Sequence, residues 1–322
     1  MYKIKQEPED FIVKEISIVP LKETGEYSYF LLKKKNYSTV RAIQHIAQAL
    51  RIKPKLIGFA GNKDKIAITE QVISIYLGKK ERVEDIRLRD IELEFLGKGD
   101  NPISLGDLEG NSFEIKVRDL SEQEIENLNQ KIKSRYILVP NLFGEQRFSS
   151  NNEKVGKAIV KGNFKEAVNL VLENKGDFEK EIKEYLKNSP NNYIGAINLI
   201  PFKTRKIYVH AYQSYLFNKT IKKYIEKKRT QMEIPIIGFG TEITDSELKE
   251  ITSNLLEKEE VTPRDFIIKQ MPDLSAEGGS RDLFFEVMDL ETEQQDNIIT
   301  LRFNLKKGCY ATVAVEFLFS KN

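Results

Sequence analysis

The sequence has few of the residues from which disulfides and metal sites are built. Its 322 residues include one cysteine, Cys309, and two histidines, His45 and His210. A single cysteine cannot form an internal disulfide, which favours a reducing, cytoplasmic setting. Because thiolate and imidazole ligands are so scarce, we expect no metal site.

Long apolar runs are missing as well. No run approaches the roughly 20 residues that a membrane-spanning helix needs, and the first residues, MYKIKQEPEDF, lack the apolar core of a signal peptide. A hydrophobic content of 40% with 31% charged residues predicts a globular protein. The length allows two domains. We expect a cytoplasmic monomer that does not bind a membrane.

Acidic residues are absent from a long basic segment, residues 27–63, which Asp64 follows directly. The cations of this segment are Lys33, Lys34, Lys35, Arg41, Arg51, Lys53, Lys55 and Lys63. A second acid-free stretch, 297–315, carries Arg302, Lys306 and Lys307. One basic run is usually a solvated face, but two that include aromatic rings favour binding of unstacked nucleobases. Asp64 is then either a turn residue or a reactive group where polyanions bind.

Asp64 is expected on a loop between strands. Periodicity predicts strands over 10–16 and 27–35 and a helix over 38–52, capped by Ser38 or Thr39. Val40, Ile43, Ala47 and Leu50 would share the buried face of that helix. Strands are also predicted over 56–61 and 71–78, on either side of the Asp64 loop, and loops on rigid scaffolds often present reactive groups.

The remainder of the chain predicts an interrupted domain. A hairpin is expected over 103–120, with its turn at Gly110-Asn111 and with Phe113, Ile115 and Val117 facing inward. Ser121 and Glu124 form a capping box. Residues 151–230 read as helical, with a break at Gly162 and an end near Gly176. A strand over 232–240, a helix from Thr244, and strands over 275–291 and 298–319 follow. The return to strands favours a domain into which the middle region is inserted.

Several motifs, in this order, carry a resemblance: KQEPEDFIVKE (5–15), AGNKDKIAITEQ (60–71), LEGNSFEIKVRDL (108–120), PNLFGEQRF (140–148), SYLFN (214–218) and RFNLKKGCYATV (302–313). Together they resemble the TruD family of tRNA pseudouridine synthases over nearly the whole chain. The resemblance implies an α+β pseudouridine synthase fold, with a mixed, largely antiparallel sheet flanked by helices. It also implies a catalytic domain of residues 1–150 plus 279–322, and an inserted, mainly helical α/β TRUD domain of residues 151–278.

The resemblance implies the isomerisation of a specific tRNA uridine, number 13, to pseudouridine without a cofactor. It makes Asp64 the catalytic aspartate and gives five substrate-binding residues: Lys5, Phe11, Asn141, Phe143 and Tyr310. The aspartate would attack the uracil ring or serve the ribose after uracil departs, and both routes stay open. The target base must leave its stack. Taken singly, these aromatic residues would be ordinary core residues.

Other functions remain open at this point. The chain could be an inactive RNA-binding protein of the same fold, or a hydrolase that releases uracil. Lys63, Lys65, Gln146 and Arg147 are expected to support loops and contact RNA. Two positions depart from the family pattern: Ser149 replaces a glycine, and Cys309 replaces a serine beside Tyr310. A regular strand over 298–319 would place Tyr310 on the same side as Arg302 and Lys306.

Overall fold

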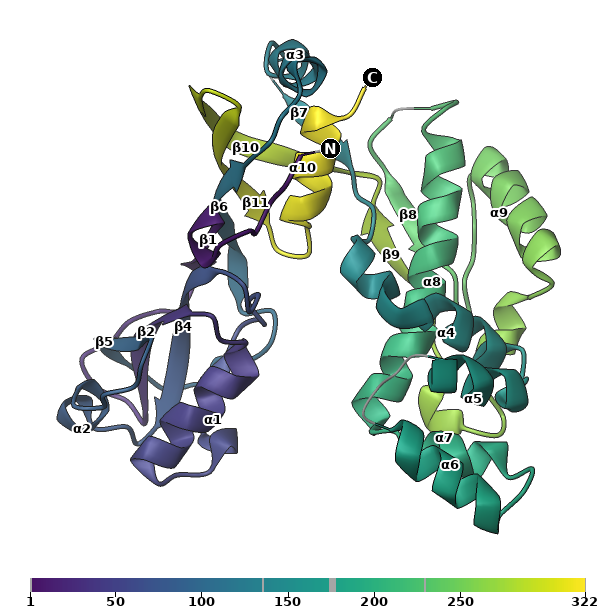
Figure 1. The fold of residues 1–322 in the computed structure, drawn as a ribbon, viewed down its shortest axis with the longest axis horizontal. Coiled ribbons are helices and arrows are strands. Elements are labelled where there is room, and N and C mark those ends of the chain that lie inside the picture. Colours follow the sequence, from purple (N-terminus) through teal and green to yellow (C-terminus); the bar gives the residue numbers. More distant parts are fainter. Residues whose placement is uncertain (1, 135, 174–177, 229, 322) are drawn as a thin grey trace. The chain divides into compact units, whose positions relative to one another are not determined.

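The computed structural model describes residues 2–134, 136–173, 178–228 and 230–321. The chain forms two compact units, one of residues 1–139 with 285–322 and one of residues 140–284 (Figure 1). These divisions differ from the expected boundaries at 150 and 279, because the whole PNLFGEQRF motif and the strand that follows Gly278 belong to the second unit. The assignment of the first unit as the catalytic domain stays a prediction. Among the described residues, no helix is both long and apolar enough to cross a bilayer.

The first unit is built on one sheet with the strand order β5-β2-β4-β1-β6-β11-β10-β7, and β3 pairs with β4. β1 and β4 are parallel, and the other pairs with a described register in this sheet are antiparallel. The predicted α+β class with a largely antiparallel sheet is therefore confirmed. The strands are β1 (Phe11–Ser17), β2 (Tyr27–Lys35), β3 (Ile57–Phe59), β4 (Ile68–Tyr76), β5 (Ile91–Gly99), β6 (Leu108–Val117), β7 (Ile137–Pro140), β10 (Phe284–Gln295) and β11 (Ile298–Lys306).

The helices that flank this sheet in the described part of the unit are α1 (Thr39–Leu50), α2 (Lys80–Glu84), α3 (Glu122–Lys131) and α10 (Ala311–Phe319). The capping box of α3 is present as predicted, and Ser38 caps α1 by accepting a hydrogen bond from the Arg41 N–H. The buried face of α1 packs on Phe30 and Ile73 of the sheet. Val40 was assigned to that face wrongly, since it is 50% exposed.

The predicted hairpin over 103–120 is wrong, because β6 runs through Gly110-Asn111 without turning. A Cβ on Gly110 would lie 2.2 Å from the Leu305 carbonyl oxygen, so glycine here permits close approach of β11 rather than a turn. Phe113, Ile115 and Val117 are buried as predicted.

The prediction of one long C-terminal strand is also wrong beyond Lys306. β11 ends there, Gly308 takes a positive φ of 83°, and α10 begins at Ala311. Apolar runs as short as ATVAVEFLF do not separate a strand from a buried helix by periodicity. Tyr310 is consequently the N-cap residue of α10 and not a strand residue.

The second unit is mainly helical, as predicted. Its helices are α4 (Asn152–Val160), α5 (Phe164–Glu173), α6 (Glu179–Asn188), α7 (Tyr193–Asn198), α8 (Phe202–Tyr224) and α9 (Ser246–Glu259), and β8 (Glu233–Ile236) pairs with β9 (Gly279–Asp282). Short 3₁₀ helices lie in both units: Pro8–Asp10 and Pro54–Leu56 in the first, and Glu145–Asn151, Pro263–Phe266 and Pro272–Leu274 in the second.

Local signals in this unit were mostly reliable. Gly162 separates α4 from α5 with a φ of 70°, whereas the expected end at Gly176 lies outside the described residues. The cap of α9 is Asp245, not Thr244, because the Asp245 carboxylate accepts a hydrogen bond from the Leu248 N–H at 2.8 Å.

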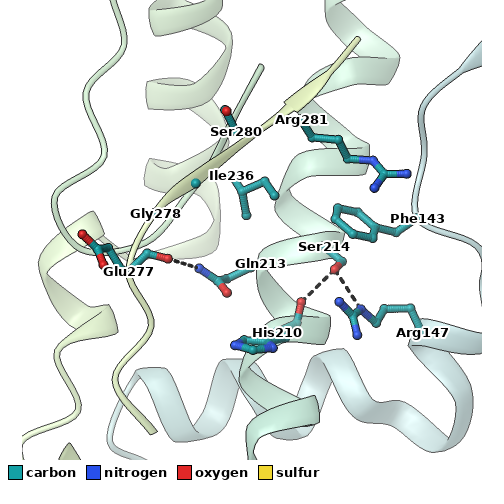
Figure 2. A pocket seen from close by; sticks show the side chains of 11 residues that line it. Phe143, Arg147, His210, Gln213, Ser214, Ile236, Glu277, Gly278, Ser280 and Arg281 are labelled. Atoms are coloured by element: carbon teal, nitrogen blue, oxygen red, sulfur yellow. Dashed lines mark hydrogen bonds between the residues drawn. The ribbon is translucent and has the colours of Figure 1, made fainter. Parts of the chain in front are cut away.

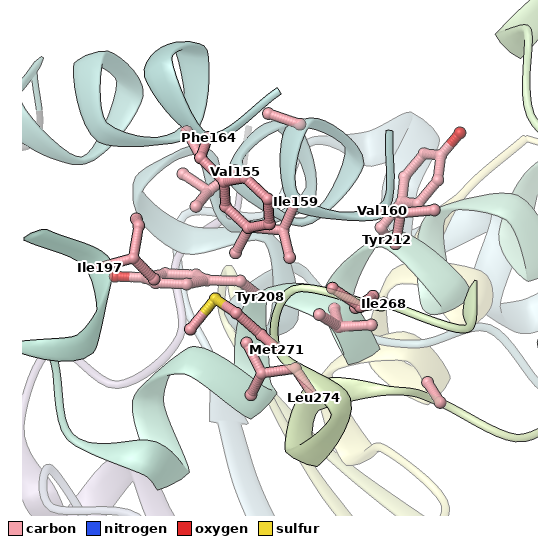
Figure 3. Close-up of a cluster of buried hydrophobic side chains, with 14 of the residues drawn as sticks. Val155, Ile159, Val160, Phe164, Ile197, Tyr208, Tyr212, Ile268, Met271 and Leu274 are labelled. Carbon is pink, nitrogen blue, oxygen red and sulfur yellow. The ribbon is translucent and has the colours of Figure 1, made fainter. Parts of the chain in front are cut away.

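The core of this unit forms where α4, α5 and α8 meet the segment around Met271 (Figure 3). Val155, Ile159 and Phe164 pack there with Tyr208. Gly156 lets α4 approach α8, since a Cβ on Gly156 would lie 2.0 Å from the Tyr208 carbonyl oxygen.

Gly156→Ala is expected to destabilise the second unit by about 1–3 kcal/mol, the usual cost of overpacking. This cost outweighs the roughly 1 kcal/mol that alanine gains in helix propensity. Gly279→Ala is the matched control, because an added Cβ there meets no atom within 4 Å. Urea unfolding of both variants measures the difference, and a Gly156→Ala protein as stable as the control would contradict this packing.

Candidate active site

The side chain of Asp64 is held by Lys5 in the first unit. The Lys5 ammonium lies 3.0 Å from Oδ2 of Asp64 and 4.0 Å from the centre of the Phe11 ring. One third of the Asp64 side chain is exposed, whereas Phe11 is 2% exposed. The structure thus brings three of the predicted site residues together, with the carboxylate open to solvent and the ring beneath the ammonium.

The segment that carries Lys5 is fastened at both ends to Arg118. Lys3 exchanges two backbone hydrogen bonds with Arg118, each of 2.8 Å, and the fully buried Asp10 carboxylate binds the Arg118 guanidinium through two nitrogens. Burial opposes ionisation of Asp10, but the Arg118 hydrogen bonds and a backbone N–H lower its pKa below the usual value. Between these anchors Lys5 has a φ of 57°, a left-handed conformation that costs a non-glycine residue about 1–2 kcal/mol.

The loop of Asp64 is fixed from inside by Lys34. The Lys34 ammonium donates hydrogen bonds to the carbonyl oxygens of Asp64, at 3.0 Å, and Tyr37, at 2.5 Å. Lys34 is only 2% exposed. Burial lowers the pKa of Lys34 to about 8, against an opposing effect of the Asp64 charge. A buried cation therefore sets the position of the Asp64 backbone.

Other residues of the AGNKDKIAITEQ motif support the Asp64 loop at its two ends. The Lys63 N–H donates to Thr39 Oγ1 at 2.9 Å, and Thr39 in turn donates to Gln71. Gln71 completes the chain by donating to the Gly61 carbonyl oxygen at 3.1 Å. The Lys63 ammonium lies 3.0 Å from the Glu15 carboxylate, and both side chains are buried. Lys63 is thus a loop support, as predicted, and has little surface for RNA.

The prediction that Lys33, Lys34 and Lys35 form one basic surface is wrong, because Lys34 does not lie on the surface. Lys34 is buried under the loop, Lys35 pairs with Glu9, and Lys33 lies 3.9 Å from Glu94. Alternation along β2 explains the difference, because neighbouring side chains of a strand point to opposite faces.

Asn141 and Phe143 are held in the second unit. The Asn141 N–H donates to the Leu283 carbonyl oxygen at 2.8 Å, and Arg281 donates to both the backbone and the side-chain oxygen of Asn141. The Asn218 amide clamps Phe143 by accepting from its N–H at 2.8 Å and donating to its carbonyl oxygen at 2.9 Å. Phe217 packs edge-on against the Phe143 ring. Hydrogen bonds and ring packing therefore hold the PNLFGEQRF and SYLFN motifs against each other.

Comparisons with known proteins agree with this arrangement. The family described as tRNA pseudouridine synthase D (TruD) matches residues 2–181, 171–229 and 219–316. The tRNA pseudouridine synthase D of Aquifex aeolicus is 31% identical, with 98% of each chain covered. A Methanosarcina acetivorans protein, named as a probable tRNA pseudouridine synthase D, is 31% identical over 97% of this chain and 91% of its own. The chain belongs to the TruD family.

A solved structure extends the likeness to the fold. The crystal structure of a Methanosarcina mazei protein, described as a tRNA pseudouridine synthase D, superposes with a TM-score of 0.79 at 27% identity. It covers 99% of this chain and 94% of its own. TruD proteins are tRNA pseudouridine synthases, which are isomerases.

The departures from the TruD pattern are accommodated locally. Ser149 lies in the 3₁₀ helix after Phe143 without a positive φ, and its hydroxyl donates to the Gln146 carbonyl oxygen at 3.1 Å. Cys309 is partly buried beside Tyr310, which is half-buried at the start of α10 in the first unit. The role of Tyr310 toward substrate stays a prediction.

Three supporting residues were not identified from the sequence. Lys34 was taken as part of a basic surface, although alternation along β2 puts it on the same face as the buried Phe30 and Leu32. Gln71 belongs to the AGNKDKIAITEQ motif but was given no role. Arg281 lies in β9 and had no recognisable partner in the sequence, because Asn141 lies far away along the chain.

The stability of the wild-type protein relative to Lys34→Met is expected to rise as the pH increases from about 8 toward 10.5. Lys34 has a pKa of about 8 in the folded chain and an ordinary value of 10.5. The unfolded chain therefore binds more protons in this interval, and raising the pH favours the folded state.

Urea unfolding at several pH values measures this difference. Lys33→Met is the matched control, because it removes the same charge from an exposed position of the same strand. A pH dependence equal to that of the control would show that Lys34 is not a desolvated cation.

Proposed function

We propose that this protein isomerises a specific uridine of tRNA, uridine 13, to pseudouridine, with Asp64 as the catalytic carboxylate. The observation that carries the proposal is the geometry of Asp64. Its side chain is accessible, paired with Lys5 at 3.0 Å, and held on a loop that the buried Lys34 fixes. The family match over both units supports the reaction class.

The reaction needs one carboxylate and no change in oxidation state. The bond between uracil N1 and the ribose C1′ breaks, the freed base rotates, and C5 bonds to the same C1′. The proton on C5 is lost and N1 gains one, so that atoms balance. Asp64 can act as a nucleophile or as a general base in these steps. Lys5 keeps the carboxylate aligned.

The remaining site residues would hold the flipped nucleotide. Asn141 keeps its amide N–H donors for the edge of uracil, because Arg281 donates to its oxygen. Phe143 and Tyr310 would contact the base. Phe11 is too deeply buried to offer a face in the free protein, and we assign it to supporting Lys5.

Asp64→Asn is expected to lower single-turnover pseudouridine formation by at least about 10²-fold, the lower range for loss of a general base. Folding and tRNA affinity should stay close to wild type, because the change keeps the size of the side chain. Asp100→Asn is the matched control, since Asp100 is an exposed carboxylate of the same unit.

Nucleotide-resolution mapping of pseudouridine on unmodified tRNA tests the proposal and the target together. Wild-type turnover by the Asp64→Asn protein would disprove the role of Asp64. Binding of tRNA without any modification would indicate an RNA-binding protein, and release of free uracil would indicate a hydrolase.

Turnover is also expected to persist in a chelator without added cofactor, provided that the tRNA stays folded. Among the described residues, no group of three or more His, Cys, Asp or Glu side chains is placed to hold a metal ion. Rates measured with EDTA and a polyamine that keeps the tRNA folded should match those without EDTA. A loss of activity that only a divalent metal restores would contradict this expectation.

A further inference from the structure

A pocket of about 300 Å³ lies within the second unit. Its lining includes Phe143, Arg147, His210, Ser214 and Arg281, together with the backbone around residues 277–280. Figure 2 shows Phe143 between the two arginines. The proposed isomerisation uses Phe143 but gives no role to the arginines or to the histidine.

Two positive charges meet at the Phe143 ring. The guanidinium carbons of Arg281 and Arg147 lie 4.6 Å and 5.5 Å from its centre. Two like charges near one ring repel each other, which adds to the cost of holding both groups there. Stacking on one aromatic ring offsets part of that cost, and it fixes the orientation of both planar groups.

Arg147 has few partners in the protein. Among the described residues no carboxylate forms an ion pair with it, and its side chain makes one hydrogen bond, from Nε to Ser214 Oγ at 3.3 Å. The Ser214 hydroxyl itself donates to the His210 carbonyl oxygen at 2.8 Å. A guanidinium has five N–H donors, so most of those of Arg147 remain available to a ligand.

The surroundings of the pocket are electropositive. Burial and the charges of Arg147 and Lys206 together lower the pKa of His210. The carboxylate of Glu277 lies on the far side of the pocket from both arginines (Figure 2), and the Glu277 backbone oxygen is taken by Gln213 at 3.1 Å. The arginine side of the pocket is therefore suited to an anion.

We propose that this pocket holds a backbone phosphate of the RNA, next to the nucleotide that is flipped out, through Arg147. The inference rests on the proposed function, because Phe143, one of the proposed substrate-binding residues, lines this pocket. One guanidinium can donate two parallel hydrogen bonds to phosphate oxygens, so that it supplies both charge and orientation. A phosphate held here would fix the RNA backbone on one side of the target.

The salt dependence of tRNA affinity tests the site. Arg147→Gln is expected to weaken binding about 10- to 100-fold, the range for one hydrogen-bonded charge. It should reduce the slope of log affinity against log salt by about 0.7–0.9, as loss of one phosphate contact requires. Arg147→Lys should keep most of the slope. Arg264→Gln is the matched control, because Arg264 is an exposed arginine of the same unit that does not line the pocket.

A second measurement does not depend on a variant that folds. The chain has two histidines, so proton NMR can follow each through a pH titration of the wild-type protein. The dinucleotide UpU should raise the pKa of His210 by offsetting the nearby positive charges, whereas uridine, which has no phosphate, should not. His45 lies in the other unit and serves as the internal control.

The outcomes separate this site from the proposed function. An unchanged salt slope for Arg147→Gln, or a His210 that does not respond to UpU, would overturn the phosphate site even if the wild-type protein forms pseudouridine. A changed slope and a responsive His210 in a protein that forms no pseudouridine would support the phosphate site and disprove the proposed isomerisation.

Discussion

The buried ammonium of Lys34 places the backbone of Asp64, and the geometry of the candidate active site depends on it. A cation removed from water is costly unless hydrogen-bond acceptors surround it. Here two carbonyl oxygens, of Tyr37 and Asp64, accept its hydrogen bonds. Because the Asp64 loop closes over Lys34 to supply one of these oxygens, the burial of this charge restricts the conformations that the loop can take. The Asp64 carboxylate can then remain accessible without becoming mobile.

The carboxylate is oriented by a second element that is distant in sequence. Lys5 reaches Asp64 from a segment that two links to Arg118 hold in place, and its left-handed backbone is kept by those links. Strain of this kind persists where the surrounding structure over-determines the conformation, and it is common at functional sites. In the second unit a side chain likewise fixes a backbone segment, because Asn218 forms hydrogen bonds with both the N–H and the carbonyl oxygen of Phe143.

Charge is distributed differently from what the basic segments suggested. Cations that follow one another along β2 have separate tasks, since Lys34 is inside and Lys35 is paired with Glu9. In the second unit, Arg147 and Arg281 meet at the Phe143 ring, and neither basic segment contains them. Local runs of lysine are a poor guide to a binding surface, because a strand sends alternate side chains to opposite faces.

Patterns along the chain predicted most helices and strands and the loop that carries Asp64, whereas the fold class and the family came from the resemblance of the motifs to TruD proteins. The local predictions follow from short-range rules: periodicity and capping residues such as Ser38 and Ser121. The end of β11, the passage of β6 through Gly110, and the partners of Lys34, Asn141 and Arg147 became known from the three-dimensional structure alone. Gly110 reads as a turn until the neighbouring strand shows that its missing Cβ makes room for Leu305. The partners of a buried cation likewise depend on elements that folding alone brings together, so no local pattern encodes them.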